Sequence, residues 1–313
     1  MNDWKIFQGN GETNSNAIER LPAPPRWRRF NSKRTGSATN KERLGITFQT
    51  PPEAVELVNA ALYLRRPLLV TGKPGIGKTS LIYAVANELD LGEVLRWSIT
   101  TRTTLKNGLY DYDAIGRLQE TQRIFKEVEL SGKKAVNIDE AIDIGQFLQL
   151  GPLGTALLPS KRPRVLLIDE IDKSDIDLPN DLLNVFEEGE FEIPELVRLK
   201  KKVDQVTVRT SYCDEKEIIT CSDITTIIED GRVTCQTFPF IIMTSNGERD
   251  FPPPFLRRCL RLDMREPDEQ ALEAIVTAHL EDLNDEAKVL IKEFLDRRDG
   301  KNGKQGGDLV LCK

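Results

Sequence analysis

Short runs of consecutive apolar residues alternate with helical patterns along most of the chain. Such runs are typical of parallel strands that are buried on both faces. They occur within 67–71, 164–168 and 238–245, and apolar stretches interrupted by an arginine occur at 93–99 and 259–263. Apolar residues at helical spacing lie between them, for example at 55–64, 81–86 and 178–188. This alternation predicts an α/β fold with central parallel strands covered by helices.

The pattern changes in three other regions, which suggests a division of the chain. Residues 1–45 hold few large apolar residues and cluster arginines around Trp27, so we expect a largely disordered, basic arm. Residues 46–266 would form the folded core, and apolar and polar residues alternate at about 195–237, where we expect a β-rich insertion. Residues 267–313 predict two amphipathic helices, at 268–283 and 286–297, and a flexible C-terminus.

Composition narrows the class of protein. Of 313 residues, 39% are hydrophobic and 30% are charged, and the net charge is -6, which argues against binding of nucleic acid along the whole chain. No apolar run approaches the roughly 20 residues of a membrane span, and the N-terminus resembles no signal peptide. We expect a cytoplasmic protein without membrane insertion. Five scattered cysteines without a C-x-x-C pair suggest neither a zinc site nor a disulfide framework.

A glycine-rich stretch joins the first apolar run to the next helical pattern. It consists of Gly72, Lys73, Pro74, Gly75, Ile76, Gly77, Lys78 and Thr79, followed by Ser80, and fits the Walker A pattern G-x-x-x-x-G-K-[ST]. Glycines let backbone N–H groups converge on phosphate oxygens, and the helix dipole adds positive potential there. We therefore expect a bound nucleoside triphosphate, with Lys78 at its β and γ phosphates and the Thr79 hydroxyl on Mg²⁺.

Two acids directly follow the third apolar run. Asp169 would anchor Mg²⁺ through its water shell, and Glu170 would polarise an attacking water. The alternative is an acidic turn without a ligand, since Asp172, Asp175 and Asp177 follow closely. A Walker A motif upstream favours the nucleotide site, and the acid pair favours hydrolysis over phosphoryl transfer to a metabolite.

Polar residues also follow or precede the last two apolar runs. Asn246 comes at the end of the fourth, where its amide could orient water against the γ-phosphate. Arg257 and Arg258 stand before the fifth without an acidic neighbour in their turn, which suits an anion brought from outside. A surface salt bridge is the alternative.

Taken in order, the Walker A stretch, the Asp169-Glu170 pair, the strand that ends in Asn246 and the arginines of FLRRC resemble the AAA+ ATPases. The resemblance covers roughly residues 45–298. Within that superfamily the chain is similar to the MoxR-like group, in the run from GPLG at 151–154 through LLIDEIDKSDIDLPNDLLNVFEEGEFEIPEL and in the segment TSNGE at 244–248.

The resemblance implies a P-loop NTPase fold and a set of roles. The fold is a three-layer one, with a parallel five-stranded sheet of order 5-1-4-3-2 and nucleotide between the sheet and a small helical lid. The activity is hydrolysis of ATP to ADP and phosphate, with ATP and Mg²⁺ bound. The implied roles are nucleotide binding by Lys78, nucleotide and metal binding by Thr79, metal binding by Asp169, water activation by Glu170, sensor 1 for Asn246, and an arginine finger for Arg258 or, as second choice, Arg257.

The resemblance also implies partners: copies of the chain in a ring, often hexameric, and a client protein that the ring remodels. Two departures from the family pattern favour a second hypothesis. The predicted lid helices hold no clear sensor 2 arginine, and the chain ends before a full lid is expected to form. An incomplete lid would suit a nucleotide-dependent assembly scaffold with little turnover. A third hypothesis, a nucleic-acid motor of McrB-like type, is supported only by the basic arm and the lysines at 200–202.

Overall fold

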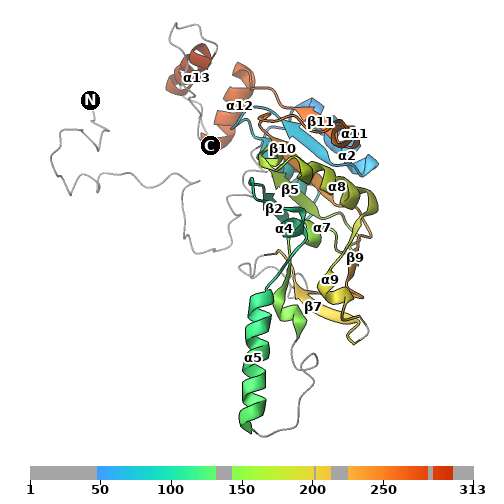
Figure 1. The fold of residues 1–313 in the computed structure, drawn as a ribbon. Helices are drawn as coiled ribbons and strands as arrows, with labels where there is room; N and C mark the ends of the chain where they lie inside the picture. The colour runs from blue at the N-terminus through green and yellow to red at the C-terminus, as the bar shows by residue number, and fades with distance from the viewer. Residues whose placement is uncertain (1–47, 132–142, 201, 213–224, 281–284, 299–313) are drawn as a thin grey trace, which may run out of the picture.

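The computed structural model describes residues 48–131, 143–200, 202–212, 225–280 and 285–298. The predicted basic arm and the glycine-rich C-terminal stretch lie outside these ranges. Two sheets form the body of the protein, one in the upper and one in the lower part of Figure 1.

The upper sheet is parallel throughout. Its five strands are β1 (Leu68–Thr71), β2 (Val94–Ser98), β5 (Val165–Asp169), β10 (Phe240–Ser245) and β11 (Leu260–Asp263). Their spatial order is β11-β1-β10-β5-β2, which reads 5-1-4-3-2 when these strands are numbered along the chain. Because all five run the same way, their carboxyl ends meet at one edge, where open α/β sheets bind ligands.

Helices cover both faces of this sheet, because its strands are apolar on both sides. Leu68 and Val70 of β1 face one core, together with α2 (Pro52–Leu64) and α3 (Lys78–Glu88). Leu69, between them, belongs to a second core on the other face. That face is covered by α4 (Leu105–Leu109), α7 (Pro152–Ala156), α8 (Asp177–Glu188) and α11 (Pro253–Arg258). The arrangement has the three layers of an α/β P-loop NTPase.

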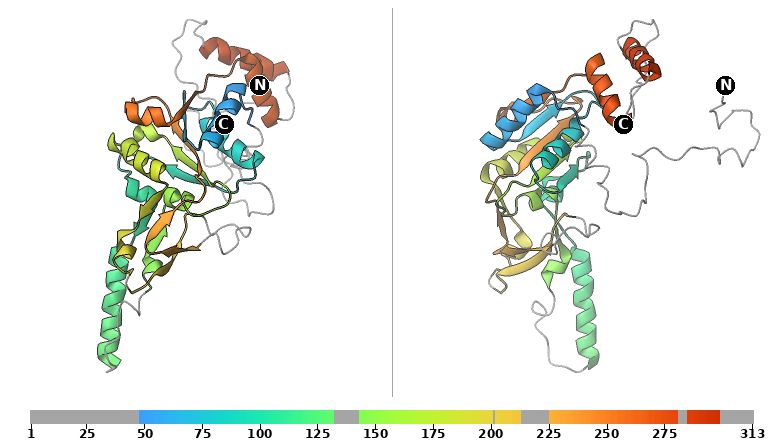
Figure 2. Two further views of the ribbon diagram at one scale, coloured as in Figure 1. Left: turned by 90° about the vertical axis from the view of Figure 1, so that its right-hand side faces the viewer. Right: turned by 180° about the vertical axis from the view of Figure 1, so that it is seen from behind.

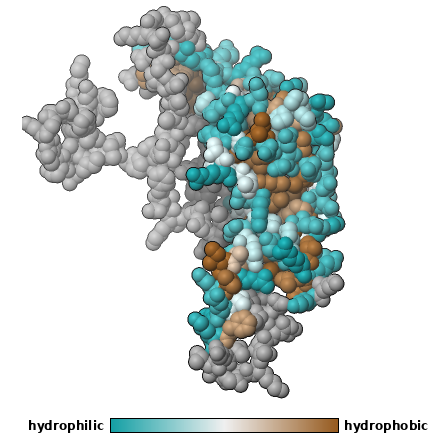
Figure 3. Space-filling model, viewed as in Figure 1, coloured by the Kyte–Doolittle hydropathy of each residue, from teal (hydrophilic) through white to brown (hydrophobic). Residues whose placement is uncertain are grey.

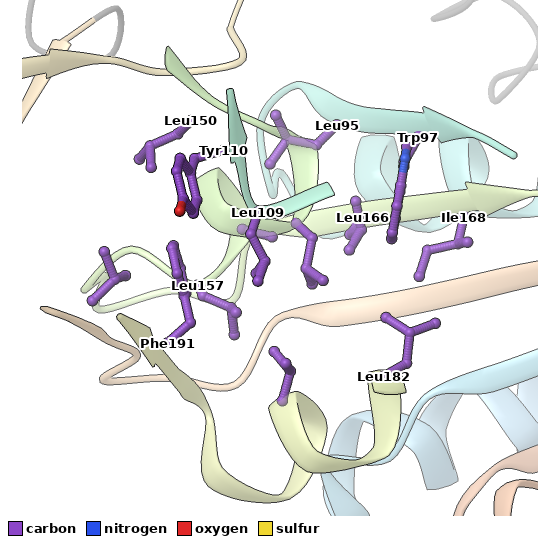
Figure 4. Close-up of a cluster of buried hydrophobic side chains, with 14 of the residues drawn as sticks. Leu95, Trp97, Leu109, Tyr110, Leu150, Leu157, Leu166, Ile168, Leu182 and Phe191 are labelled. Atoms are coloured by element: carbon purple, nitrogen blue, oxygen red, sulfur yellow. The ribbon is translucent and has the colours of Figure 1, made fainter. Parts of the chain in front are cut away.

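The lower sheet has six strands in the order β3-β4-β7-β8-β9-β6. They are β3 (Tyr110–Tyr112), β4 (Leu148–Leu150), β6 (Glu190–Glu192), β7 (Gln205–Arg209), β8 (Thr225–Glu229) and β9 (Arg232–Thr234). Phe191 from this sheet shares the second core with Leu166 and Ile168 of β5 (Figure 4). Val208 of β7 belongs to the same core. The lower sheet therefore packs on the upper sheet through a common hydrophobic cluster.

The predicted β-rich segment supplies only part of the lower sheet. It contributes β7, β8 and β9, with the short helix α9 (Pro194–Val197) before them. Strands β3, β4 and β6 were not predicted from the sequence. Strands β3 and β4 come from between β2 and β5, and all three have three residues each. Such short strands show too little alternation to be recognised, and pairing with distant strands stabilises them.

Three further helices, α5, α12 and α13, are not among those that cover the faces of the upper sheet. Helix α5 (Ala114–Ser131) extends away from both sheets in every view of Figures 1 and 2. The two helices predicted after Pro267 are present as α12 (Glu269–Leu280) and α13 (Asp285–Arg298), and each buries one apolar residue, Leu272 and Ile291. Their role as a lid stays a prediction.

The described surface is mixed in character. Figure 3 shows a largely hydrophilic face with separate apolar patches in its upper and lower parts. Within the described ranges, no helix has both the length and the apolar character that a membrane span requires.

Candidate nucleotide-binding site

The glycine-rich stretch forms the loop between β1 and α3, at the carboxyl edge of the parallel sheet. Gly77 precedes the helix with a φ of 97°, in the left-handed region that favours glycine. No side chain caps the first turn of α3, which begins at Lys78. Uncapped N–H groups at a helix start, with the positive end of the helix dipole, are suited to bind an anion.

Lys78 links this loop to the end of β10. The residue is only 7% exposed, and its Nζ donates hydrogen bonds to the carbonyl oxygens of Gly72 at 2.6 Å and Lys73 at 2.9 Å. A third bond, of 2.8 Å, goes to Oδ1 of Asn246. Burial lowers the pKa of Lys78, while the carboxylates of Asp172, Asp169 and Glu170 oppose that shift. The structure thus brings together the Walker A lysine and the predicted sensor asparagine.

Asp169 at the end of β5 is the most highly connected acid of the site. Its Oδ1 accepts hydrogen bonds from the hydroxyls of Thr244 at 2.7 Å and Thr79 at 3.3 Å. Its Oδ2 accepts a hydrogen bond from the guanidinium of Arg96, on β2, at 2.6 Å. The predicted metal-binding residues Thr79 and Asp169 therefore meet, and a cationic side chain already neutralises the carboxylate.

Glu170 has an unusual backbone conformation. Its φ of 61° lies in the left-handed region, which is uncommon for a residue with a side chain. Strained conformations of this kind cluster at functional sites. Its backbone N–H donates to Oγ1 of Thr244 at 2.9 Å, and its carboxylate pairs with Nζ of Lys173 at 2.8 Å. The side chain is 43% exposed, so a solvent molecule can reach it.

The residues present fit a magnesium nucleotide. Mg²⁺ prefers oxygen ligands and is commonly held by one or two carboxylates together with phosphates and water. Thr79 and Asp169 offer such oxygens beside the phosphate-binding loop. Within the described ranges no group of three or more His, Cys, Asp or Glu is placed to hold a metal ion.

The two predicted finger arginines lie elsewhere, at the C-terminal end of α11. Nε of Arg258 donates a hydrogen bond to Glu187 on α8, and its NH1 donates to the carbonyl of Pro254 at 3.3 Å. No acid lies in the turn that holds these arginines, but Arg258 gains an acidic partner from α8, which packs on α11. This contact is the surface salt bridge of the alternative interpretation, and the finger role stays a prediction. Arg257 is exposed.

Comparison with known proteins agrees with this geometry. The family model described as "ATPase family associated with various cellular activities (AAA)" matches residues 68–267, which is more than half of the chain. The chain belongs to this AAA family. The matched residues of this AAA ATPase include the P-loop, the Asp169-Glu170 pair, Asn246 and both arginines. A separate search of curated proteins found no match.

Four polar residues of the site were not identified from sequence as parts of it. Arg96 and Thr244 contact Asp169. Asp172 contacts the backbone of Asn246, and Lys173 contacts Glu170. A weak signal existed for Asp172, which lies in the acidic turn after Glu170. A polar residue within an apolar run was the signal for Arg96 and Thr244, but such a pattern does not say which partner the side chain reaches.

Proposed function

We propose that this AAA ATPase hydrolyses ATP to ADP and phosphate at the carboxyl edge of its parallel sheet. The observation that carries the proposal is the bond of Lys78 to Asn246, together with that of Thr79 to Asp169. These contacts join the Walker A loop to the ends of β10 and β5. A site with those groups together can bind a triphosphate and activate water beside it.

The residues divide the work by their chemistry. The loop from Gly72 to Ser80 would hold the phosphates through backbone N–H groups, and Lys78 would exchange its carbonyl partners for phosphate oxygens. Mg²⁺ bound by Thr79, and through water by Asp169, would neutralise charge on the phosphates. Glu170 would then accept a proton from water, and the Asn246 amide would orient that water.

Two substitutions test this division. Glu170→Gln should bind ATP but lower turnover by a factor on the order of 10² or more, because the amide cannot accept the proton. Lys78→Ala should lose most nucleotide affinity, so the thermal stabilisation of the parent by ATP should shrink. Steady-state phosphate release and thermal unfolding with ATP measure the two effects. A Glu170→Gln variant as active as the parent would contradict the assignment of the base.

For the biological role, the proposal is a MoxR-like remodelling factor that works as a ring, often hexameric in this superfamily, on a client protein. The resemblance of the LLIDEIDK run and of the TSNGE segment supports the subgroup. AAA proteins commonly assemble into rings, which supports the ring. Helix α5, which extends from the body and exposes Ile115 and Phe125, offers one surface for contacts with other molecules.

One observation favours the scaffold hypothesis as a second candidate. Nζ of Lys173 pairs with the Glu170 carboxylate at 2.8 Å, so Glu170 must leave this ion pair before it can accept a proton from water. A scaffold would bind ATP tightly and turn it over slowly, so nucleotide affinity compared with steady-state turnover separates the two candidates. Of the lysines at 200–202 on which the McrB-like hypothesis partly rests, Lys200 pairs with Asp230 at 2.9 Å, and Lys201 lies outside the described residues.

A further inference from the structure

A buried carboxylate near the site takes no part in the roles described so far. Asp172 lies in the short helical turn η4 (Ile171–Lys173), directly after the Walker B strand, and is 2% exposed. An acid so thoroughly removed from water is costly unless its oxygens are hydrogen-bonded. The contacts of this side chain therefore indicate what it does.

Both hydrogen bonds to Asp172 come from the backbone of the loop after β10. Its Oδ2 accepts from the N–H of Asn246 at 2.9 Å and from the N–H of Glu248 at 3.2 Å. The other oxygen, Oδ1, is buried and accepts no hydrogen bond from the described residues. One carboxylate oxygen thus holds two N–H groups of a loop that lies 74 residues further along the chain.

The held loop carries the predicted sensor. The backbone of Asn246 is bonded to Asp172, while its side chain accepts a hydrogen bond from Lys78 at 2.8 Å. Asp172 therefore holds the backbone of the residue whose side-chain amide contacts Lys78. A shift of about 1 Å in a positioned group can change a reaction rate by a factor of about 10².

The geometry points to Asp172 as a positioning residue, which holds the loop after β10 so that the Asn246 amide stands beside Lys78 and the γ-phosphate of bound ATP. The inference rests on the proposed function, because it assigns Asp172 an effect through Asn246. Among the described residues, Asp172 makes no hydrogen bond to Lys78 or to the rest of the P-loop.

Two substitutions of Asp172 separate its hydrogen bonds to the loop from its negative charge. Asp172→Ala removes the acceptor, whereas Asp172→Asn loses the charge but keeps one oxygen for the two N–H groups. We expect Asp172→Ala to lower kcat by about 10- to 100-fold with a much smaller change in KM, and Asp172→Asn to recover most of that loss. Asp143→Ala is a matched control, because the Asp143 side chain also accepts a backbone N–H, that of Gly145 at 2.9 Å, at a different place in the fold.

A double-mutant cycle tests whether the effect passes through Asn246. If Asp172 acts by placing that amide, Asp172→Ala should lower kcat little further in an Asn246→Ala background. A second measurement does not require hydrolysis: the affinity for a non-hydrolysable ATP analogue, divided by that for ADP, should fall in Asp172→Ala and return in Asp172→Asn.

The outcomes distinguish this inference from the proposed function. A parent protein that binds the analogue but does not hydrolyse ATP would contradict the proposed function, and the affinity ratio would still decide the role of Asp172. Fully additive losses with Asn246→Ala, an unchanged ratio in Asp172→Ala, or an Asp172→Asn variant as impaired as Asp172→Ala would each overturn the inference.

Discussion

Individual charged side chains of the candidate site form ion pairs with one another. Asp169 pairs with Arg96 and Glu170 pairs with Lys173. Arg96 is 45% exposed at its side chain, so water screens much of its charge, and the pair contributes little to stability. Its effect on function is larger, because Mg²⁺ at Thr79 and Asp169 would approach a resident positive charge.

We therefore expect Arg96→Gln to bind Mg²⁺ more tightly. Removing a like charge a few Å from a divalent ion should increase the Mg²⁺-dependent gain in nucleotide affinity by about 3- to 10-fold. The gain is the affinity for a fluorescent ADP in Mg²⁺ divided by that in EDTA. Arg102→Gln is a matched control, since Arg102 is exposed in the loop after β2. A gain that stays the same or falls in Arg96→Gln would contradict this expectation.

The turn between β8 and β9 illustrates the scale of single elements. Asp230 and Gly231 have φ values of 56° and 72°, which is the two-residue hairpin geometry that the sequence Glu-Asp-Gly-Arg predicts. Tertiary structure adds a second constraint at this turn. The carbonyl of Gly231 accepts the N–H of Ile193 at 2.8 Å, and an added Cβ would lie 2.6 Å from the backbone nitrogen of Val197.

Gly231→Ala should therefore destabilise the protein by about 2–4 kcal/mol, from backbone strain and from the clash with α9. Gly92→Ala is the matched control: its φ is 83°, and nothing lies within 4 Å of an added Cβ. That control carries only the backbone cost of about 1 kcal/mol. Urea unfolding of both variants measures the difference, and equal losses would show that the contact with α9 is not tight.

At the scale of the whole molecule, the arginines of α11 decide whether the site is complete in one subunit. Arg258 pairs with Glu187 of its own chain. Both side chains are about half exposed, so this pair is weak enough to be exchanged for another anion. A finger role requires that a neighbouring subunit's nucleotide replace Glu187 as the partner, which is what the ring proposal assumes.

Mixing variants tests that assumption. Arg258→Ala should bind ATP normally and hydrolyse it poorly, and mixing it with Glu170→Gln should restore part of the activity, because some interfaces then combine an intact Glu170 with an intact Arg258. Phosphate release after subunit exchange measures the rescue. The matched control mixes Arg258→Ala with a Glu170→Gln/Arg258→Ala double variant, in which no interface holds Arg258. Equal activities in the two mixtures would identify Arg258 as a surface salt-bridge residue.

Features whose residues are contiguous could be predicted from the amino-acid sequence. The P-loop could be recognised because its glycines, Lys78 and Thr79 act within one loop and the helix that follows it. The long apolar runs identified buried strands for a similar reason, since the central strands β5 and β10 are buried along their whole length. Acids or an amide at the ends of such strands predicted the site at the carboxyl edge.

Only the tertiary structure decided which distant polar groups meet. Arg96 reaches Asp169, Asp172 holds the backbone of Asn246, and Glu187 pairs with Arg258, although each pair comes from separate elements. The three-residue strands β3 and β4 likewise exist because they pair with each other across a long separation in sequence. A sequence pattern reports the environment that a residue needs, whereas hydrogen bonds between elements depend on how the whole chain packs.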